Sequence, residues 1–254
     1  MKKILLGLIP LLLIGLLVAF STLNRAKPAP ETAQAGAVEV STAAVIDPDF
    51  TDFLKQFPKV GLPYNLSAEY LKDYFAAAIQ LDEKSDDAEQ EALYNSRVRL
   101  HDPRRFLPAS RHSSFSRIPV FLEPVARIET KNHYAAVYSE SQGFGWAYKS
   151  YHVAVYTKSG RLLSEHTIAG TGSTELTAVA IDARLHAVVQ TYRINWKKDY
   201  YENGTEGNEI TGLTLDTAKA LDLTQPDKEL RDYKPADKED VESDEEDAIG
   251  AVDR

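Results

Sequence analysis

The sequence predicts an α+β fold, in which N-terminal helices pack on an antiparallel meander sheet of six to seven strands, built either as an open sheet or as a small sandwich. Before residue 100, apolar residues recur at helical spacing. After Arg117, seven segments are rich in Val, Ile, Tyr and Thr, which favour strands. The connections between these segments are too short for helical crossovers, so neighbouring strands should pair antiparallel.

The chain divides into four parts: a hydrophobic segment (residues 1–23), a flexible linker (24–46), one globular domain (47–226) and an acidic tail (227–254). The domain is helical over residues 47–112 and β-rich over 117–218. Residues 4–23 carry no charge and come after two lysines, which predicts a membrane-spanning segment that exports the rest of the chain. Small residues at Ala19 and Ser21 also fit a cleaved signal peptide, but the apolar run is longer than a typical signal core and favours an uncleaved anchor.

Charge is concentrated in the tail. Residues 227–254 hold 12 acids and 5 bases, a net charge of −7, whereas the whole chain is at −9. The rest of the chain is therefore nearly neutral, which excludes the broad basic surface that nucleic-acid binding requires, and the tail should be disordered. The chain has no cysteine, which excludes disulfides, zinc–thiolate sites, thiol catalysis and a lipid-modified N-terminal cysteine.

Three helices are expected in the N-terminal part of the domain. The first carries Phe50, Phe53, Leu54 and Phe57 on one face and ends at Pro58, after which the chain should be extended to residue 63. The second begins after the N-cap Ser67 and runs to about residue 81. Its core-facing positions are Tyr70, Leu71, Tyr74, Phe75 and Ala78. The third covers residues 85 to about 97, with acids in its first turn.

Six arginines come after these helices between residues 95 and 117: Arg97, Arg99, Arg104, Arg105, Arg111 and Arg117. We expect them to pair with the acids just upstream: Asp82, Glu83, Asp86, Asp87, Glu89 and Glu91. The alternative is a site for an anion or a phosphate group.

The strands are expected at residues 120–129, 133–141, 150–157, 161–169, 175–182, 186–196 and 209–217. Alternation along each strand assigns the inward-facing side chains. These are Val153 and Val155, then Thr177, Val179 and Ile181, then Val188, Tyr192 and Ile194, and finally Leu213 and Leu215.

Two histidines are the only candidate metal pair. If residues 158–160 form a three-residue loop with Gly160 left-handed, Thr157 pairs with Arg161 and His152 lies opposite His166, close enough to share a metal ion. With a two-residue loop, His152 faces Thr167 instead. A third ligand is not evident, and an ordinary cross-strand pair is the favoured interpretation. No phosphate loop, dinucleotide fingerprint or catalytic serine or zinc motif is present in the sequence.

The connections of a meander alternate between the two ends of the sheet. Short turns at residues 130–132, 158–160 and 183–185 share one end, and the connections at 142–149, 170–174 and 197–208 share the other; the first and last of these three are long. The long loops and the strand end beside them carry six large aromatic residues: Phe144, Trp146, Tyr148, Trp196, Tyr200 and Tyr201. Such residues form either a plug that seals the core or a surface that binds a partner.

These features favour a membrane-tethered, exported protein of a bacterial cell envelope that acts as a non-catalytic binding or interaction module. The expected partners are the membrane, through residues 4–23, and a protein or glycan at the long-loop end, with no nucleic acid. We expect no cofactor and assign no catalytic residue. An envelope hydrolase or metal-dependent enzyme and a purely structural or assembly protein are the alternatives.

Overall fold

The computed structural model describes residues 47–84, 87–108, 120–142, 147–228 and 230. All of them belong to a compact unit that spans residues 44–254. The hydrophobic segment, the linker and the tail from residue 231 onward lie outside the described residues. Within the described part, no helix is both long and apolar enough to cross a membrane.

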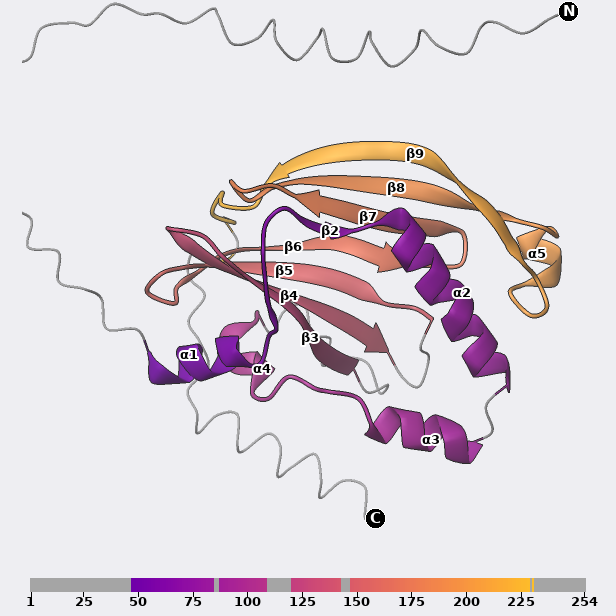
Figure 1. The fold of residues 1–254 in the computed structure, drawn as a ribbon, viewed down its shortest axis with the longest axis horizontal. Coiled ribbons are helices and arrows are strands. Elements are labelled where there is room, and N and C mark those ends of the chain that lie inside the picture. The colour runs from indigo at the N-terminus through magenta and orange to yellow at the C-terminus, as the bar shows by residue number, and fades with distance from the viewer. Residues whose placement is uncertain (1–46, 85–86, 109–119, 143–146, 229, 231–254) are drawn as a thin grey trace, which may run out of the picture. The chain divides into compact units, whose positions relative to one another are not determined.

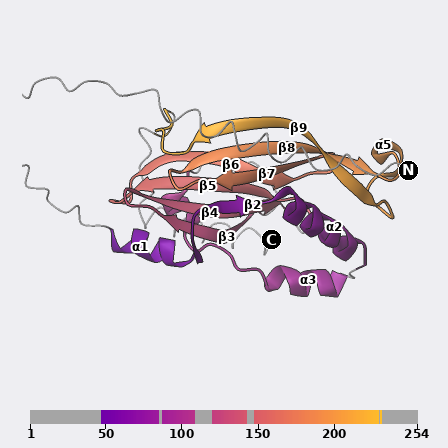
Figure 2. The same ribbon diagram turned by 45° about the horizontal axis from the view of Figure 1, so that its top comes forward.

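A curled mixed sheet of nine strands makes up most of the described chain (Figure 1). Its strands are β1 (Lys59–Val60), β2 (Tyr64–Leu66), β3 (Val120–Glu129), β4 (His133–Gln142), β5 (Ser150–Thr157), β6 (Leu162–Thr171), β7 (Glu175–Ile181), β8 (His186–Trp196) and β9 (Ile210–Asp222). The order is β1-β3-β4-β5-β6-β7-β8-β9, with β2 beside β7. Among the described strands, only the β1–β3 pair is parallel. Figure 2 shows β9 at the border of the curled sheet, away from α1 (Pro48–Lys55) and α3 (Asp87–Asn95).

The seven expected strands are all present as consecutive antiparallel neighbours, but the expected total of six to seven is too small. Strands β1 and β2 come from the N-terminal part of the domain, on either side of the turn around Pro63. The pairing of β2 with β7 has a geometric reason. Strands β6 and β7 share only the pairs Gly170↔Thr177 and Thr171↔Leu176. The edge of β7 that β6 leaves open at residues 179–181 is bonded to β2 instead.

Five helices accompany the sheet in the described chain: α1, α2 (Ala68–Lys84), α3, α4 (Pro103–Phe106) and α5 (Tyr200–Asn203). The first three match the expected helices. The hydroxyl of Ser67 accepts a hydrogen bond of 3.1 Å from the backbone N–H of Tyr70, so the expected N-cap of α2 is confirmed. The single-turn helices α4 and α5 were not expected.

The sheet is buried on both faces at its centre. Leu71 and Phe75 of α2 pack over one face, with Val153 and Val155 of β5. Helices α1 and α4 cover the other face, where Phe50 packs against the ring of Tyr156 with a centroid separation of 4.9 Å. Six of the eight residues of β5 are therefore buried, and alternate side chains of this strand belong to different clusters.

Three expected core positions are wrong. Tyr70 is 56 % exposed because it lies about 100° around α2 from Leu71, outside the stripe that faces the sheet. Val188 is 45 % exposed, while its neighbour Ala187 is fully buried, so this end of β8 turns its opposite face to the core. Leu215 is 52 % exposed in the border strand β9. The expected burial of Val153, Val155, Val179, Ile181 and Ile194 is confirmed.

Candidate functional site

Four of the six aromatic side chains expected at the long-loop end are described, and these four gather there. Trp196, the last residue of β8, stacks on Tyr200 with ring centroids 5.8 Å apart and planes inclined by 26°. Tyr201 lies edge-on to Tyr200 at 5.7 Å. Phe75 of α2 contacts the ring of Trp196 at 6.4 Å and the ring of Tyr148 at 5.6 Å. We call these five residues the aromatic end. Phe144 and Trp146 lie outside the described residues.

Polar contacts join the three connections at this end. The indole N–H of Trp196 donates a 2.8 Å hydrogen bond to the carbonyl oxygen of Ser173 in the β6–β7 connection. The hydroxyl of Ser173 lies 3.2 Å from the hydroxyl of Tyr148 in the β4–β5 connection. The expectation that these connections share one end of the sheet is therefore confirmed for the described residues.

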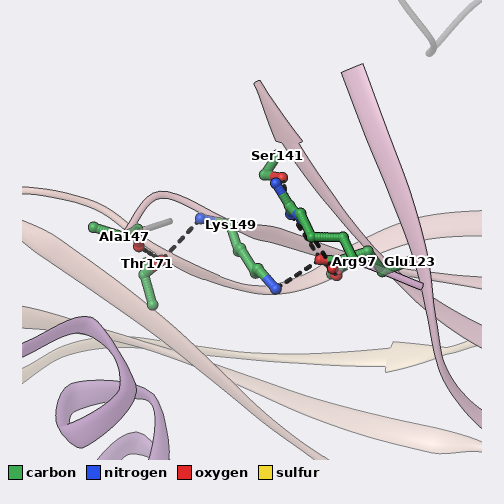
Figure 3. Close-up of polar contacts among 7 residues, drawn as sticks. Arg97, Glu123, Ser141, Ala147, Lys149 and Thr171 are labelled. Atoms are coloured by element: carbon green, nitrogen blue, oxygen red, sulfur yellow. Dashed lines mark hydrogen bonds and ion pairs between the residues drawn. The ribbon is translucent and has the colours of Figure 1, made fainter. Parts of the chain in front are cut away.

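Thr171 fixes the backbone on both sides of Tyr148 (Figure 3). Its hydroxyl donates to the carbonyl oxygen of Ala147 and accepts from the N–H of Lys149 at 2.9 Å. Its own N–H donates to the carbonyl oxygen of Lys149 at 2.8 Å. Tyr148 thus projects from a short segment that is hydrogen-bonded to β6, although its own side chain is 45 % exposed.

A buried charged cluster holds the other side of this segment (Figure 3). The Glu123 carboxylate accepts hydrogen bonds from Arg97 Nε at 3.0 Å, Arg97 Nη2 at 2.8 Å and Lys149 Nζ at 2.7 Å. The Arg97 side chain is 1 % exposed and that of Lys149 is 13 % exposed. Burial on its own would raise the pKa of the Glu123 carboxyl, but the bonds from Arg97 and Lys149 outweigh it and lower the pKa to about 2.

Two of the arginines pair with acids outside the expected upstream run. Arg97 pairs with Glu123 of β3, and Arg105 pairs with Asp47 and Asp49 at the start of α1. None of these acids belongs to the upstream run expected from the sequence, because the fold brings acids from distant segments to the arginines. The side chain of Arg104 and the whole of residues 111 and 117 lie outside the described part.

The connection that carries Tyr200 and Tyr201 is internally bonded. The Asp199 carboxylate accepts from the N–H of Tyr201 at 2.8 Å and so caps α5. The Asn208 side chain accepts from the N–H of Lys198 at 3.0 Å and donates to the carbonyl oxygens of residues 198 and 204. These bonds hold the two tyrosines in place in a segment with few apolar contacts, and Tyr201 is 88 % exposed.

A groove of about 240 Å³ runs between α2 and the β8–β9 connection. Trp196, Ile79 and Ile210 supply its apolar wall. Its polar lining consists of Lys72, Asp73, Gln80, Glu83, Asn208 and Glu209. Trp196 also packs against the core cluster beneath α2. This tryptophan therefore acts as part of a plug and as a wall of the groove at the same time.

The histidine pair considered from the sequence does not form. Of the two loops considered, the turn is the three-residue one, with Gly160 at φ +89° and the N–H of Thr157 bonded to the carbonyl oxygen of residue 161. A β-bulge between Val155 and Tyr156 then shifts the register by one residue, so His152 faces Thr167 and His166 faces Val153. Successive strand positions point to opposite faces, which separates the two imidazoles.

His152 belongs instead to a buried polar group on the face of the sheet that α1 covers. Its ring stacks on Tyr138 at 5.0 Å, its Nδ1 lies 3.1 Å from the Thr167 hydroxyl, and its Nε2 lies 3.4 Å from the Glu140 carboxylate. The Tyr138 hydroxyl donates to the fully buried Glu165. Burial raises the pKa of the Tyr138 hydroxyl, and the nearby Glu165 carboxylate raises it further. Among the described residues, no three His, Asp or Glu side chains are grouped to hold a metal ion.

Sequence reasoning missed the residues that support the aromatic end. Glu123 and Thr171 carry no motif, and their roles depend on which strands become neighbours. Asp199 was the one detectable signal, because an Asp before a short polar run is a common N-cap. No protein-family model matches the chain. Comparison with curated proteins and with solved structures likewise returns no match.

Proposed function

We propose that the chain is a membrane-tethered, exported module of a bacterial cell envelope that binds a protein or glycan partner at the aromatic end without catalysis. The observation that carries this proposal is the groove beside Trp196, which combines an apolar wall with charged and amide groups and has the exposed Tyr201 nearby. Partner side chains and sugar rings have apolar surfaces edged by polar groups, which such a groove can accept.

The hydrogen bonds that fix the backbone of the aromatic end favour a role in binding. Thr171 and the bonds within residues 198–208 fix the backbone that carries the tyrosines before any partner arrives. A site that is already ordered loses less conformational entropy on binding. The metal-dependent alternative has less support, because His152 and His166 occupy opposite faces of the sheet.

The test separates a binding surface from a plug. In bacterial cells that express the full chain, a photo-cross-linking residue replaces the exposed Glu206, beside the groove. The substitutions Tyr148→Ala and Tyr201→Ala are then combined. We expect the cross-linked protein or carbohydrate product to disappear while the circular dichroism and the melting temperature of residues 44–254 stay unchanged.

Tyr70→Ala is the matched control, because Tyr70 is also an exposed tyrosine, at 56 %, but does not belong to the aromatic end. It should leave the product intact. If the double variant unfolds, the tyrosines are structural and the plug interpretation is correct. If the double variant folds and the product persists at full yield, the aromatic end is not the binding surface.

A further inference from the structure

The two ends of the sheet differ in charge. The short connections at residues 130–132, 158–161 and 182–186 carry the four cations Lys131, Lys158, Arg161 and Arg184 and the single acid Asp182, a net charge of +3. The connections at the other end, residues 142–149, 170–174 and 197–209, carry three cations and four acids, a net charge of −1. We call the four cations of the short connections the turn end.

The positive charge of the turn end is accessible. Lys131, Arg161 and Arg184 have exposed side chains, and none of them forms an ion pair with a described residue. The ammonium group of Lys158 lies 3.7 Å from the centroid of the Tyr134 ring, a contact that leaves its charge in place. The neighbouring cations Lys55 and Lys59 are paired with acids and therefore add little to the net charge, whereas Asp222, opposite His186 at the end of β9, lowers it from +3 to +2.

The chain enters the domain at this same end. A Cβ atom on Gly160, in the β5–β6 turn, would lie 2.9 Å from the Phe50 ring of α1. Helix α1 thus packs directly beside the turn end. In the sequence, the hydrophobic residues 4–23 precede α1 and are joined to it through residues 24–46.

We propose that the turn end docks on the anionic phosphate headgroups of the membrane in which the chain is anchored, so that the aromatic end points away from the bilayer. This inference rests on the tether of the proposed function. Lysine and arginine side chains near an anionic lipid surface each favour association by roughly fivefold. The docking should weaken with salt, because the attraction between exposed charges is screened.

The acidic tail competes with lipid headgroups for the cations of the turn end. Leu230, just before it, is buried in the cluster beneath α1, so the tail also starts close to the turn end. Residues 231–254 carry ten acids and four bases. A tail that covered the turn end would neutralise the same cations, and the experiment must distinguish it from lipid.

The full chain is reconstituted in nanodiscs of neutral or partly anionic lipid. Because the chain has no cysteine, Ser159→Cys places one fluorescent donor on the β5–β6 turn, and the acceptor is carried on lipid headgroups. We expect energy transfer from position 159 to rise with the anionic fraction and to fall in high salt. A donor at Glu206→Cys, at the long-loop end, should show little transfer in either lipid.

Replacing Lys131, Arg161 and Arg184 by glutamine in one variant should lower the equilibrium constant for docking on anionic lipid by about a hundredfold. The matched control neutralises Arg193, Lys197 and Lys198 at the long-loop end, which removes the same total charge and should change transfer little.

Equal transfer from position 159 in neutral and anionic discs would overturn the docking. The docking would also be overturned if transfer depended on lipid charge only after residues 231–254 are deleted. That result would mean that the tail covers the turn end in the full chain. A chain that does not enter the discs would refute the tether itself.

Discussion

Glu123→Gln is the sharpest test of how the charged cluster supports the aromatic end. The substitution keeps the shape of the side chain but leaves the Arg97 guanidinium, 1 % exposed, and the Lys149 ammonium, 13 % exposed, without their shared counter-charge. Breaking a buried ion pair costs about 3–5 kcal/mol. Because 16 % of the Glu123 side chain is exposed and the amide retains one acceptor oxygen, we expect a loss of about 2–3 kcal/mol in the free energy of unfolding at pH 7.

The lowered pKa of Glu123 determines how the loss of stability in Glu123→Gln changes with pH. The pKa of Glu123 is about 2 in the folded chain against an ordinary value of 4.5. A lowered pKa means that the carboxylate stabilises the fold above pH 4.5 and that this contribution is lost as the pH falls from 4.5 towards 2. The shift corresponds to at most about 3 kcal/mol, and solvent screening of a partly exposed group reduces it. The difference in the free energy of unfolding between the unchanged chain and Glu123→Gln should therefore fall at pH 3 to about half its value at pH 7.

Urea unfolding of residues 44–254, followed by circular dichroism at pH 7 and pH 3, measures this difference. Glu209→Gln is the control. Glu209 also pairs with a lysine at 2.7 Å, but both side chains are more than 60 % exposed, so no measurable loss is expected. Equal effects of the two substitutions, or a difference for Glu123→Gln that is constant from pH 7 to pH 3, would refute the role assigned to the cluster.

Three further substitutions test local features of the fold by urea unfolding. Gly160→Ala should destabilise by about 1–3 kcal/mol, because φ is +89° and the new Cβ would lie 2.9 Å from the Phe50 ring; an unchanged unfolding midpoint contradicts this. Ser67→Ala removes the N-cap of α2 and should cost about 1 kcal/mol, with asparagine at the same position restoring most of it. Tyr138→Phe removes a hydrogen bond from the fully buried Glu165 and should cost about 1–3 kcal/mol; a neutral effect would mean that this bond does not stabilise the fold.

The sequence was sufficient for elements that depend on local signals. The bounds of β3, β5 and β8 agree with those expected, because alternating apolar residues and short turns define each strand without knowledge of its neighbours. The meander rule then placed Tyr148 and Trp196 at one end of the sheet, since it needs only the order and direction of the strands.

Features that depend on long-range geometry could not be predicted in this way. The bulge between Val155 and Tyr156 leaves no clear mark in the sequence, yet it decides which residue faces His152. The pairing of β2 with β7 depends on the divergence of β6, and the ion pair between Arg97 and Glu123 joins residues 26 positions apart. The location in a cell envelope and the role of the hydrophobic segment remain predictions from the sequence.

The most direct measurement of the central claim compares two cross-linking positions on the otherwise unchanged full chain in living cells. A photo-reactive residue in place of Glu206 samples the aromatic end, and one in place of Ser159 samples the turn end; both native residues are exposed. The binding module predicts a discrete protein or carbohydrate product from position 206 and none from position 159. The same product from both positions, or a protein or carbohydrate product from position 159 alone, would contradict it.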